Sequence, residues 1–195
     1  MNATIAKNET LLGVALAPLD FVRQVGLVIG FSLLTALAAQ IVIPLGAVPI
    51  TGQTFAVLLT GALLGSRLGA MAMIAYLIEG AAGLPFFSAG HGGLLHLMGP
   101  TAGYLIAFPA AAYITGAFAE HGWDRKFFSA AAAMAIGSVV IMFSGWLWFS
   151  LVMRTSPAIT IFDTFLKFIP GDLIKIALAA AVLPSGWRLV GRRHQ

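Results

Sequence analysis

The two residues best suited to chemistry are Asp172 and Lys175, three positions apart near the end of the 195-residue chain. Residues three apart in a helix share one face, so their side chains are expected to lie side by side. A carboxylate acceptor beside an ammonium donor suits a neutral ligand with N–H donors next to a carbonyl, such as a urea or an amide. The alternative is an ion pair that satisfies itself and anchors a helix end, where the helix dipole also favours an aspartate.

The rest of the chain is strongly apolar. It is 59% hydrophobic and only 9% charged, whereas soluble domains carry about 25% charged residues. A chain with so few charges is expected to lie in a membrane, which a helix crosses in roughly 20 residues. Charged side chains at membrane depth cost roughly 2.5–3.5 kcal/mol each, so Glu79, Asp172 and Lys175 are candidate functional residues.

Six membrane spans would use nearly the whole chain, so we expect an all-α integral membrane protein with a single membrane domain over residues 1–195. Its expected parts are an N-terminal cytoplasmic or interfacial segment (1–21), a six-helix bundle (22–183) and a basic cytoplasmic tail (184–195). The expected spans are residues 23–43, 54–65, 68–82, 99–118, 127–153 and 170–183. Pro170 suits the first turn of the last span, and Pro184 and Gly186 are expected to end it.

Positive charge is distributed unevenly over the expected loops. Eight of the 11 Lys and Arg residues fall on one side of the six spans, namely Lys7, Arg23, Arg67, Arg125, Lys126, Arg188, Arg192 and Arg193. Only Arg154 and Lys167 lie in loops on the other side. Because cytoplasmic loops are enriched in Lys and Arg, both termini are expected in the cytoplasm.

The loop between the third and fourth expected spans, residues 83–101, is rich in glycine and aromatic residues. Its length and composition indicate a functional loop, whose glycines would let backbone N–H groups point at a ligand. His91 and Thr101 in this loop, Tyr104 just after it and Gln53 before the second span are candidate ligand contacts. The alternatives are a plain re-entrant or surface loop and, for Tyr104, a place in an interfacial aromatic belt.

Small residues recur at four-residue spacing in two stripes. The first span carries Gly26, Gly30, Ser32 and Ala36, and the second and third carry Gly61, Gly65 and Gly69. Such residues let helices approach closely in lipid. The stripes therefore indicate either packing inside the bundle or docking of a partner membrane subunit.

Several chemistries are absent from the sequence. There is no P-loop, zinc motif or serine elbow, so we expect no ATP binding of the P-loop kind, no metal and no cofactor. With no cysteines there are no disulfides, and nothing indicates a nucleic-acid partner. If the protein moves solutes against a gradient, the energy must then come from a partner or from ion coupling. A membrane enzyme that uses Asp172 or Glu79 as acid or base stays open, although no recognised catalytic constellation accompanies them.

Four motifs, taken together, resemble one known family. They are VPITGQTFAVLLTGALLG (48–65), GLPFFSAGHGG (83–93), GPTAGYLIAF (99–108) and IPGDLIK (169–175), in that order. The chain is similar over about residues 22–183 to the BioY family, the biotin-specific substrate-binding (S) component of energy-coupling factor (ECF) transporters. The order and number of the motifs make the resemblance specific.

The resemblance implies a six-helix S-component bundle in the bacterial cytoplasmic membrane, with a biotin pocket open to the outside. It implies that Asp172 accepts the ureido N–H groups of biotin and that Lys175 donates to the ureido carbonyl. The Gly-rich loop would cover the pocket and help to hold the valerate carboxylate. The implied partners are a membrane scaffold protein and two ATPases, with Ser32 and Ala36 facing the scaffold.

The chain departs from the family pattern at three positions. Asn or another small polar residue is common where His91 stands, Gly where Ala102 stands, and some members carry Arg in place of Leu105. His91, Thr101 and loop N–H groups are then the expected carboxylate contacts. The alternative function is a self-sufficient biotin importer that works alone or as a homo-oligomer, without ATPases.

Overall fold

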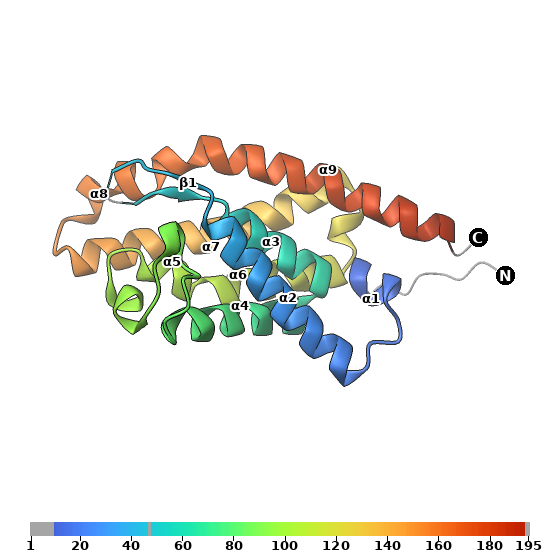
Figure 1. The fold of residues 1–195 in the computed structure, drawn as a ribbon. Helices are drawn as coiled ribbons and strands as arrows, with labels where there is room; N and C mark the ends of the chain where they lie inside the picture. The colour runs from blue at the N-terminus through green and yellow to red at the C-terminus, as the bar shows by residue number, and fades with distance from the viewer. Residues whose placement is uncertain (1–9, 47, 194–195) are drawn as a thin grey trace.

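The computed structural model describes residues 10–46 and 48–193, most of which are helical (Figure 1). The α-helices are α1 (Leu11–Ala15), α2 (Phe21–Ala39), α3 (Gln53–Leu64), α4 (Ser66–Ala81), α5 (Ala102–Ile106), α6 (Phe108–Glu120), α7 (Phe127–Val152), α8 (Pro157–Thr164) and α9 (Ile169–Arg193). Short 3₁₀ helices are η1 (Ser88–Gly90), η2 (Leu94–Met98), η3 (Trp123–Arg125) and η4 (Leu166–Phe168), and β1 (Val42–Ile43) pairs antiparallel with β2 (Ile50–Thr51). Lys7 with the rest of residues 1–9 of the expected N-terminal segment, and residues 194–195 of the expected tail, lie outside the described residues.

The helices form an elongated bundle in which α6 packs against α3, α4 and α7, while α2 packs on α4 and α9 on α7 (Figure 1). Glycines allow the close approach: a Cβ on Gly61 of α3 would lie 2.3 Å from the carbonyl oxygen of Ala112 in α6, and one on Gly69 would lie 2.9 Å from the Gly61 Cα. This stripe of small residues therefore serves packing inside the bundle. Gly26 and Gly30 on α2 differ, since a Cβ there would meet no described atom within 4 Å.

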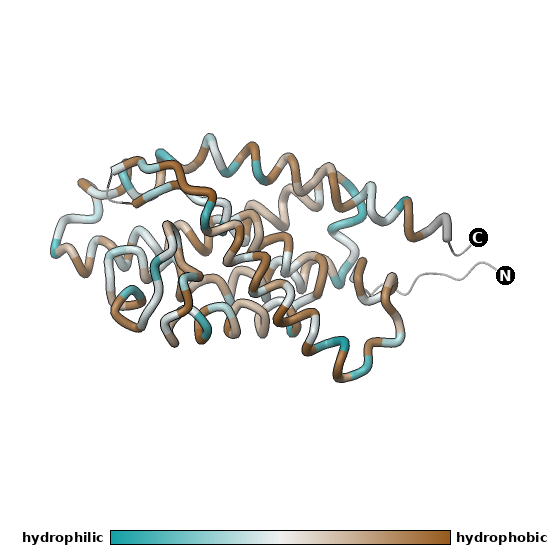
Figure 2. Tube along the Cα trace, in the orientation of Figure 1, coloured by the Kyte–Doolittle hydropathy of each residue, from teal (hydrophilic) through white to brown (hydrophobic). Residues whose placement is uncertain are grey.

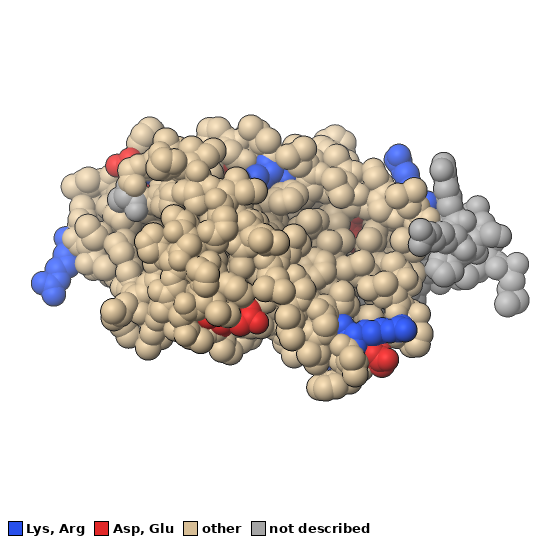
Figure 3. Space-filling model, in the orientation of Figure 1, with Lys and Arg blue, Asp and Glu red and all other residues tan. Residues whose placement is uncertain are grey.

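The outside of the bundle is apolar. Among the described residues, three helical stretches are long and apolar enough to cross a membrane, Phe21–Ala39, Ala102–Glu120 and Phe127–Val152. Apolar residues run along the helices (Figure 2), and charged side chains are sparse on the face that Figure 3 draws. Large exposed apolar surfaces of this kind mark contact with lipid or with a membrane partner.

The first long helix is shorter than predicted. We expected it to extend to Ile43, but α2 ends at Ala39 and Ile43 belongs to β1. A β-branched residue directly before Pro44 disfavours the helical conformation. The Gln40 side chain then donates to the carbonyl of Phe87 at 3.3 Å, which ties the end of α2 to the Gly-rich loop.

The last helix is longer than predicted, and the expectation that Pro184 and Gly186 end it is wrong. Helix α9 continues past both residues, although proline lacks the N–H that the helix ladder needs. Trp187 lies in this continuation: its Nε1 donates to Asp124 Oδ2 at 2.5 Å, and the Arg125 guanidinium lies 4.6 Å from its ring centroid. These contacts with η3 stabilise the helix beyond the proline.

Ser32 and Ala36, which were predicted to face a partner scaffold, are both covered in this structure, and their role in docking stays a prediction. Ser32 is 0% and Ala36 7% exposed. The Ser32 hydroxyl donates to Glu79 Oε2 of α4 at 2.6 Å. Because α4 covers this face of α2, a partner would have to displace it to reach either residue.

The two ends of the bundle carry different elements. Helix α1 and the C-terminal part of α9 lie at one end, and the β1–β2 hairpin and α8 lie at the other (Figure 1). The Gly-rich loop, with η1 and η2, also lies toward the hairpin end, beside α5. This end brings together the segments that the sequence marked as functional.

Candidate functional site

A cavity lies at the hairpin end of the bundle. Its walls come from β2 and the residues before it, α3, the Gly-rich loop, α5, α6, α7, η4 and α9. Small-molecule pockets combine apolar walls with a few placed polar groups. The lining of this cavity has that composition.

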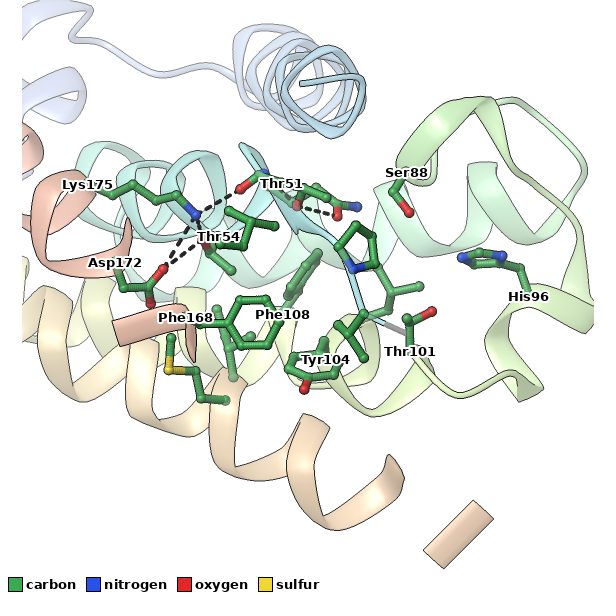
Figure 4. A pocket seen from close by; sticks show the side chains of 17 residues that line it. Thr51, Thr54, Ser88, His96, Thr101, Tyr104, Phe108, Phe168, Asp172 and Lys175 are labelled. Atoms are coloured by element: carbon green, nitrogen blue, oxygen red, sulfur yellow. Dashed lines mark hydrogen bonds and ion pairs between the residues drawn. The ribbon is translucent and has the colours of Figure 1, made fainter. Parts of the chain in front are cut away.

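Asp172 and Lys175 lie at one end of the cavity, on the first turns of α9 (Figure 4). Asp172 is 6% exposed, and Lys175 Nζ lies 3.4 Å from its Oδ1. Lys175 also donates to the Thr51 carbonyl and to Thr54 Oγ1, each at 2.8 Å. The Ser138 hydroxyl donates to Asp172 Oδ2. Neighbours on β2, α3 and α7 thus hold the two groups in place. The positions of the two side chains therefore do not depend only on their contact with each other.

The middle of the cavity is apolar. Phe108, Ile141, Met142 and Phe168 line it, and the ring of Tyr104 packs edge-on against Phe168 at 6.2 Å between centroids. The Tyr104 hydroxyl donates to a backbone carbonyl of α8 at 2.5 Å. Tyr104 therefore contributes mainly its ring to the wall.

Gln53 lies in the wall beside the charged pair, but its amide is already bonded. Its Nε2 donates to the Tyr76 hydroxyl at 2.6 Å, and its Oε1 accepts from Thr51 Oγ1 at 2.8 Å. This chain of hydrogen bonds joins α4 to β2, because Thr51 is also the residue whose carbonyl accepts from Lys175. Gln53 thus positions the backbone that holds the lysine.

The opposite end of the cavity carries Ser88, His96 and Thr101 (Figure 4). The His96 ring stacks on both Phe87 and His91, with centroids 5.1 and 5.3 Å apart. Burial, and secondarily the charge of nearby His91, lower the pKa of His96. This second polar end is separated from the charged pair by the apolar walls.

The predicted ligand contacts divide into two groups. Those that line the cavity are Asp172, Lys175, Gln53, Thr101 and Tyr104. His91 lies one layer outside the lining, exposed, with its Nδ1 2.7 Å from the Ser88 carbonyl oxygen. Glu79 is also outside the lining and accepts from Ser32 instead. Within residues 10–46 and 48–193, no group of three or more His, Asp or Glu side chains is arranged to hold a metal ion.

Sequence reasoning missed five polar residues of the site: Thr51, Thr54, Ser138, Ser88 and His96. A signal existed for Ser138, because it is a polar residue in the apolar run of an expected span, where polar groups are costly. Thr51 and Thr54 lie inside one of the recognised motifs. Ser88 and His96 had no spacing signal, since the loop that carries them is irregular.

Known proteins resemble this chain over most of its length. The model of the BioY family matches residues 6–192. A probable biotin transporter BioY of Pyrococcus horikoshii is 38% identical over 160 residues, which cover 82% of this chain and 93% of that protein. The biotin transporter BioY of Rhizobium etli is 36% identical over 166 residues, covering 75% and 87% of the two chains.

A solved structure agrees with these relatives. The crystal structure of the S-component for biotin from an ECF-type ABC transporter superposes with a TM-score of 0.77 at 26% identity, covering 89% of this chain and 92% of that one. The relatives are named as transporters or transporter components. Since the family match runs from residue 6 to residue 192, this chain belongs to the BioY family.

Proposed function

We propose that this protein is the biotin-binding subunit of a biotin uptake transporter. The observation that carries the proposal is the Asp172–Lys175 pair, held at one end of a cavity with apolar walls in a chain of the BioY family. The relatives named above are biotin transporters or a biotin S-component.

The polar ring and the hydrocarbon part of biotin match the charged end and the apolar walls of the cavity. The Asp172 carboxylate accepts the ureido N–H groups, and Lys175 donates to the ureido carbonyl. Hydrogen bonds to charged groups contribute about 1.5–3 kcal/mol each, and the apolar walls bury the hydrocarbon part of the ligand. Lys175 is positioned for this by Thr51 and Thr54, which leaves it beside the carboxylate and facing the cavity.

In the membrane, the chain crosses six times as a multi-pass protein of the bacterial cytoplasmic membrane, with both termini inside and the cavity open to the outside. Two observations support this arrangement. Helix α1 and the last part of α9 lie at the same end of the bundle, opposite the cavity (Figure 1). The excess of Lys and Arg falls on the loops of the terminal side, as expected for cytoplasmic loops.

Delivery of biotin into the cell uses an ECF membrane scaffold and two ATPases as partners. The sequence supports a need for partners, since it contains no P-loop, and the structural relative is an S-component of an ECF-type transporter. The competing arrangement is a homo-oligomer that imports biotin without ATPases.

Two measurements test the proposal. Labelled biotin is titrated into the purified protein, with thiamine and riboflavin as controls, and we expect saturable binding of biotin alone. Biotin uptake is then followed in cells with and without the scaffold and ATPases. Equal uptake in both strains would favour the self-sufficient importer, and absence of biotin binding would refute the proposed function.

A further inference from the structure

The hydrogen bonds of Gln53 continue beyond the charged end of the cavity, into the Gly-rich loop. The Tyr76 hydroxyl, which accepts from Gln53 Nε2 at 2.6 Å, donates in turn to the carbonyl of Phe86 at 3.0 Å. At the other end, Thr51 donates its hydroxyl to Gln53, and its carbonyl accepts from Lys175 (Figure 4). One chain of polar groups therefore runs from the lysine of the charged pair to the loop that forms the opposite end of the cavity.

The middle of this chain is shielded from solvent. Tyr76 is 0% and Gln53 5% exposed. Buried polar groups are costly unless they are hydrogen-bonded, and a fully bonded network specifies one arrangement of its members. Because the bonds all donate toward Phe86, the loss of the Tyr76 hydroxyl would take an acceptor from the Gln53 amide and a donor from the Phe86 carbonyl. The tyrosine hydroxyl is thus the link between the two halves of the chain.

The ring of Tyr76 also holds the Gly-rich loop. It stacks on Phe86 at 6.2 Å between centroids and meets Phe87 edge-on at 5.7 Å. Its third aromatic neighbour, Phe108 at 6.2 Å, lines the cavity. Ser88, the residue that follows Phe87, lines the cavity as well. One tyrosine of α4, through its ring and its hydroxyl, therefore fixes the segment of the loop that leads into the cavity wall.

Lys175 depends on this chain through the backbone of β2. Its Nζ donates to the Thr51 carbonyl at 2.8 Å, so the place of that carbonyl affects where the ammonium lies. The β1–β2 hairpin pairs only two residues of each strand, and an isolated hairpin is at best marginally stable. The Thr51 hydroxyl donates to Gln53 Oε1 at 2.8 Å and accepts from the Gln53 N–H at 3.3 Å. These bonds therefore help to hold the carbonyl that binds the lysine.

We propose that Tyr76 is a positioning residue for biotin binding, which sets the place of Lys175 through Gln53 and Thr51 and links it to the Gly-rich loop. The inference rests on the proposed function, because it takes biotin as the ligand and Lys175 as its contact. Tyr76 itself lies outside the cavity lining. The affinity of the charged end thus depends on how the loop at the opposite end is held.

The test removes single links of the chain and keeps the shape of each side chain. Tyr76→Phe keeps the ring that stacks on Phe86, while Thr51→Val keeps the carbonyl that accepts from Lys175. Labelled biotin is titrated into each variant alone, into the double variant, and into each variant in a Lys175→Met background, and thermal unfolding checks that all are folded. The matched control is Tyr113→Phe, which removes the hydroxyl of an exposed tyrosine on α6.

We expect Tyr76→Phe and Thr51→Val each to raise the Kd of biotin by about fivefold to thirtyfold, within the range for residues coupled through one hydrogen-bond network. Because both cut the same chain, the double variant should lose less than the product of the two factors. In Lys175→Met, which has no ammonium to position, Tyr76→Phe should change the Kd by less than about twofold. A purely structural role of Tyr76 predicts the same factor of loss in both backgrounds.

Two results would overturn the inference: a Kd of Tyr76→Phe equal to that of the wild type, or the same factor of loss with and without Lys175. An equal loss of affinity in Tyr113→Phe would also overturn it, because the effect would then not be local. If Tyr76→Phe does not fold, Thr51→Val in the two backgrounds decides by the same comparison. Biotin binding to the wild type would in each case still support the proposed function, whereas wild-type protein that binds no biotin would refute both.

Discussion

Replacing Asp172 by asparagine tests the charged end of the cavity with the smallest change in shape. The substitution removes the negative charge and turns one acceptor oxygen into an NH₂ donor. Asp172 is 6% exposed, so water has little room to replace the interaction that is lost. Lys175 keeps its bonds to Thr51 and Thr54 at 2.8 Å, and it is therefore expected to stay in position.

The magnitude follows from these contacts. Of the two ureido N–H groups of biotin, asparagine can accept one through its remaining oxygen and faces the other with a donor. One charged hydrogen bond is therefore lost, at about 1.5–3 kcal/mol. Since about 1.4 kcal/mol is a factor of ten in affinity, we expect the Kd of biotin to rise by about tenfold to 150-fold.

The assay is a titration of labelled biotin into purified wild-type and Asp172→Asn protein, together with a thermal unfolding curve of each. Glu79→Gln is the matched control, because it neutralises a carboxylate that lies outside the cavity lining and bonds to Ser32. A Kd for Asp172→Asn within a factor of two of the wild type, in a folded protein, would refute the proposed role of Asp172 in binding the ureido ring. An equal loss of affinity in Glu79→Gln would show that the effect is not local.

Two further predictions concern pH and packing. Burial raises the pKa of Asp124 from 3.8 to about 6, so the stability that its protonated form contributes is present below pH 3.8 and lost as pH rises through about 6. This loss is worth up to about 3 kcal/mol, and thermal unfolding of Asp124→Asn between about pH 4 and pH 7 should lack it. The same dependence of melting temperature on pH in the variant and the wild type would contradict the prediction. Gly61→Ala should destabilise the bundle by about 1–3 kcal/mol through overpacking, since its Cβ would lie 2.3 Å from a backbone oxygen. Gly26→Ala, with open space around it, should raise the melting temperature slightly, because alanine favours a helix by about 0.5–1 kcal/mol over glycine. Equal melting temperatures for both variants would refute the packing argument.

The sequence was most informative where regular helices carry the signal. Asp172 and Lys175 are three residues apart in a helix, so their proximity followed from helical geometry alone. The starts of α3, α4 and α7 also lie within two residues of the predicted spans, because long apolar runs and the glycine turn at Gly65 mark them clearly. Helical spacing, apolar runs and a glycine turn were sufficient to predict these features.

Features that depend on contacts between distant segments were harder to predict. Pro184 is a helix-ending signal when only its neighbours are considered, yet α9 continues because Trp187 bonds to Asp124 of η3, 63 residues away in sequence. Ser32 and Ala36 have the spacing of a docking stripe, but spacing does not say whether α4 or a partner covers them. Helix α8 was missed although Ser156 and Pro157 are suitable residues for a helix start, because its short length gave little periodicity.

The two histidines of the Gly-rich loop show where such reasoning ends. His91 and His96 are five residues apart, and only the path of the chain between them decides which one reaches the cavity. That path turns at Gly93, which has a φ of +91°, and its N–H donates to the carbonyl of Gly80 on α4 at 2.7 Å. The turn needs a glycine because other residues rarely adopt positive φ, so Gly93→Ala should displace His96 from the cavity lining while leaving Asp172 and Lys175 in place. We expect biotin to bind that variant more weakly than the wild type, and an unchanged Kd would show that the path of the loop does not shape the cavity.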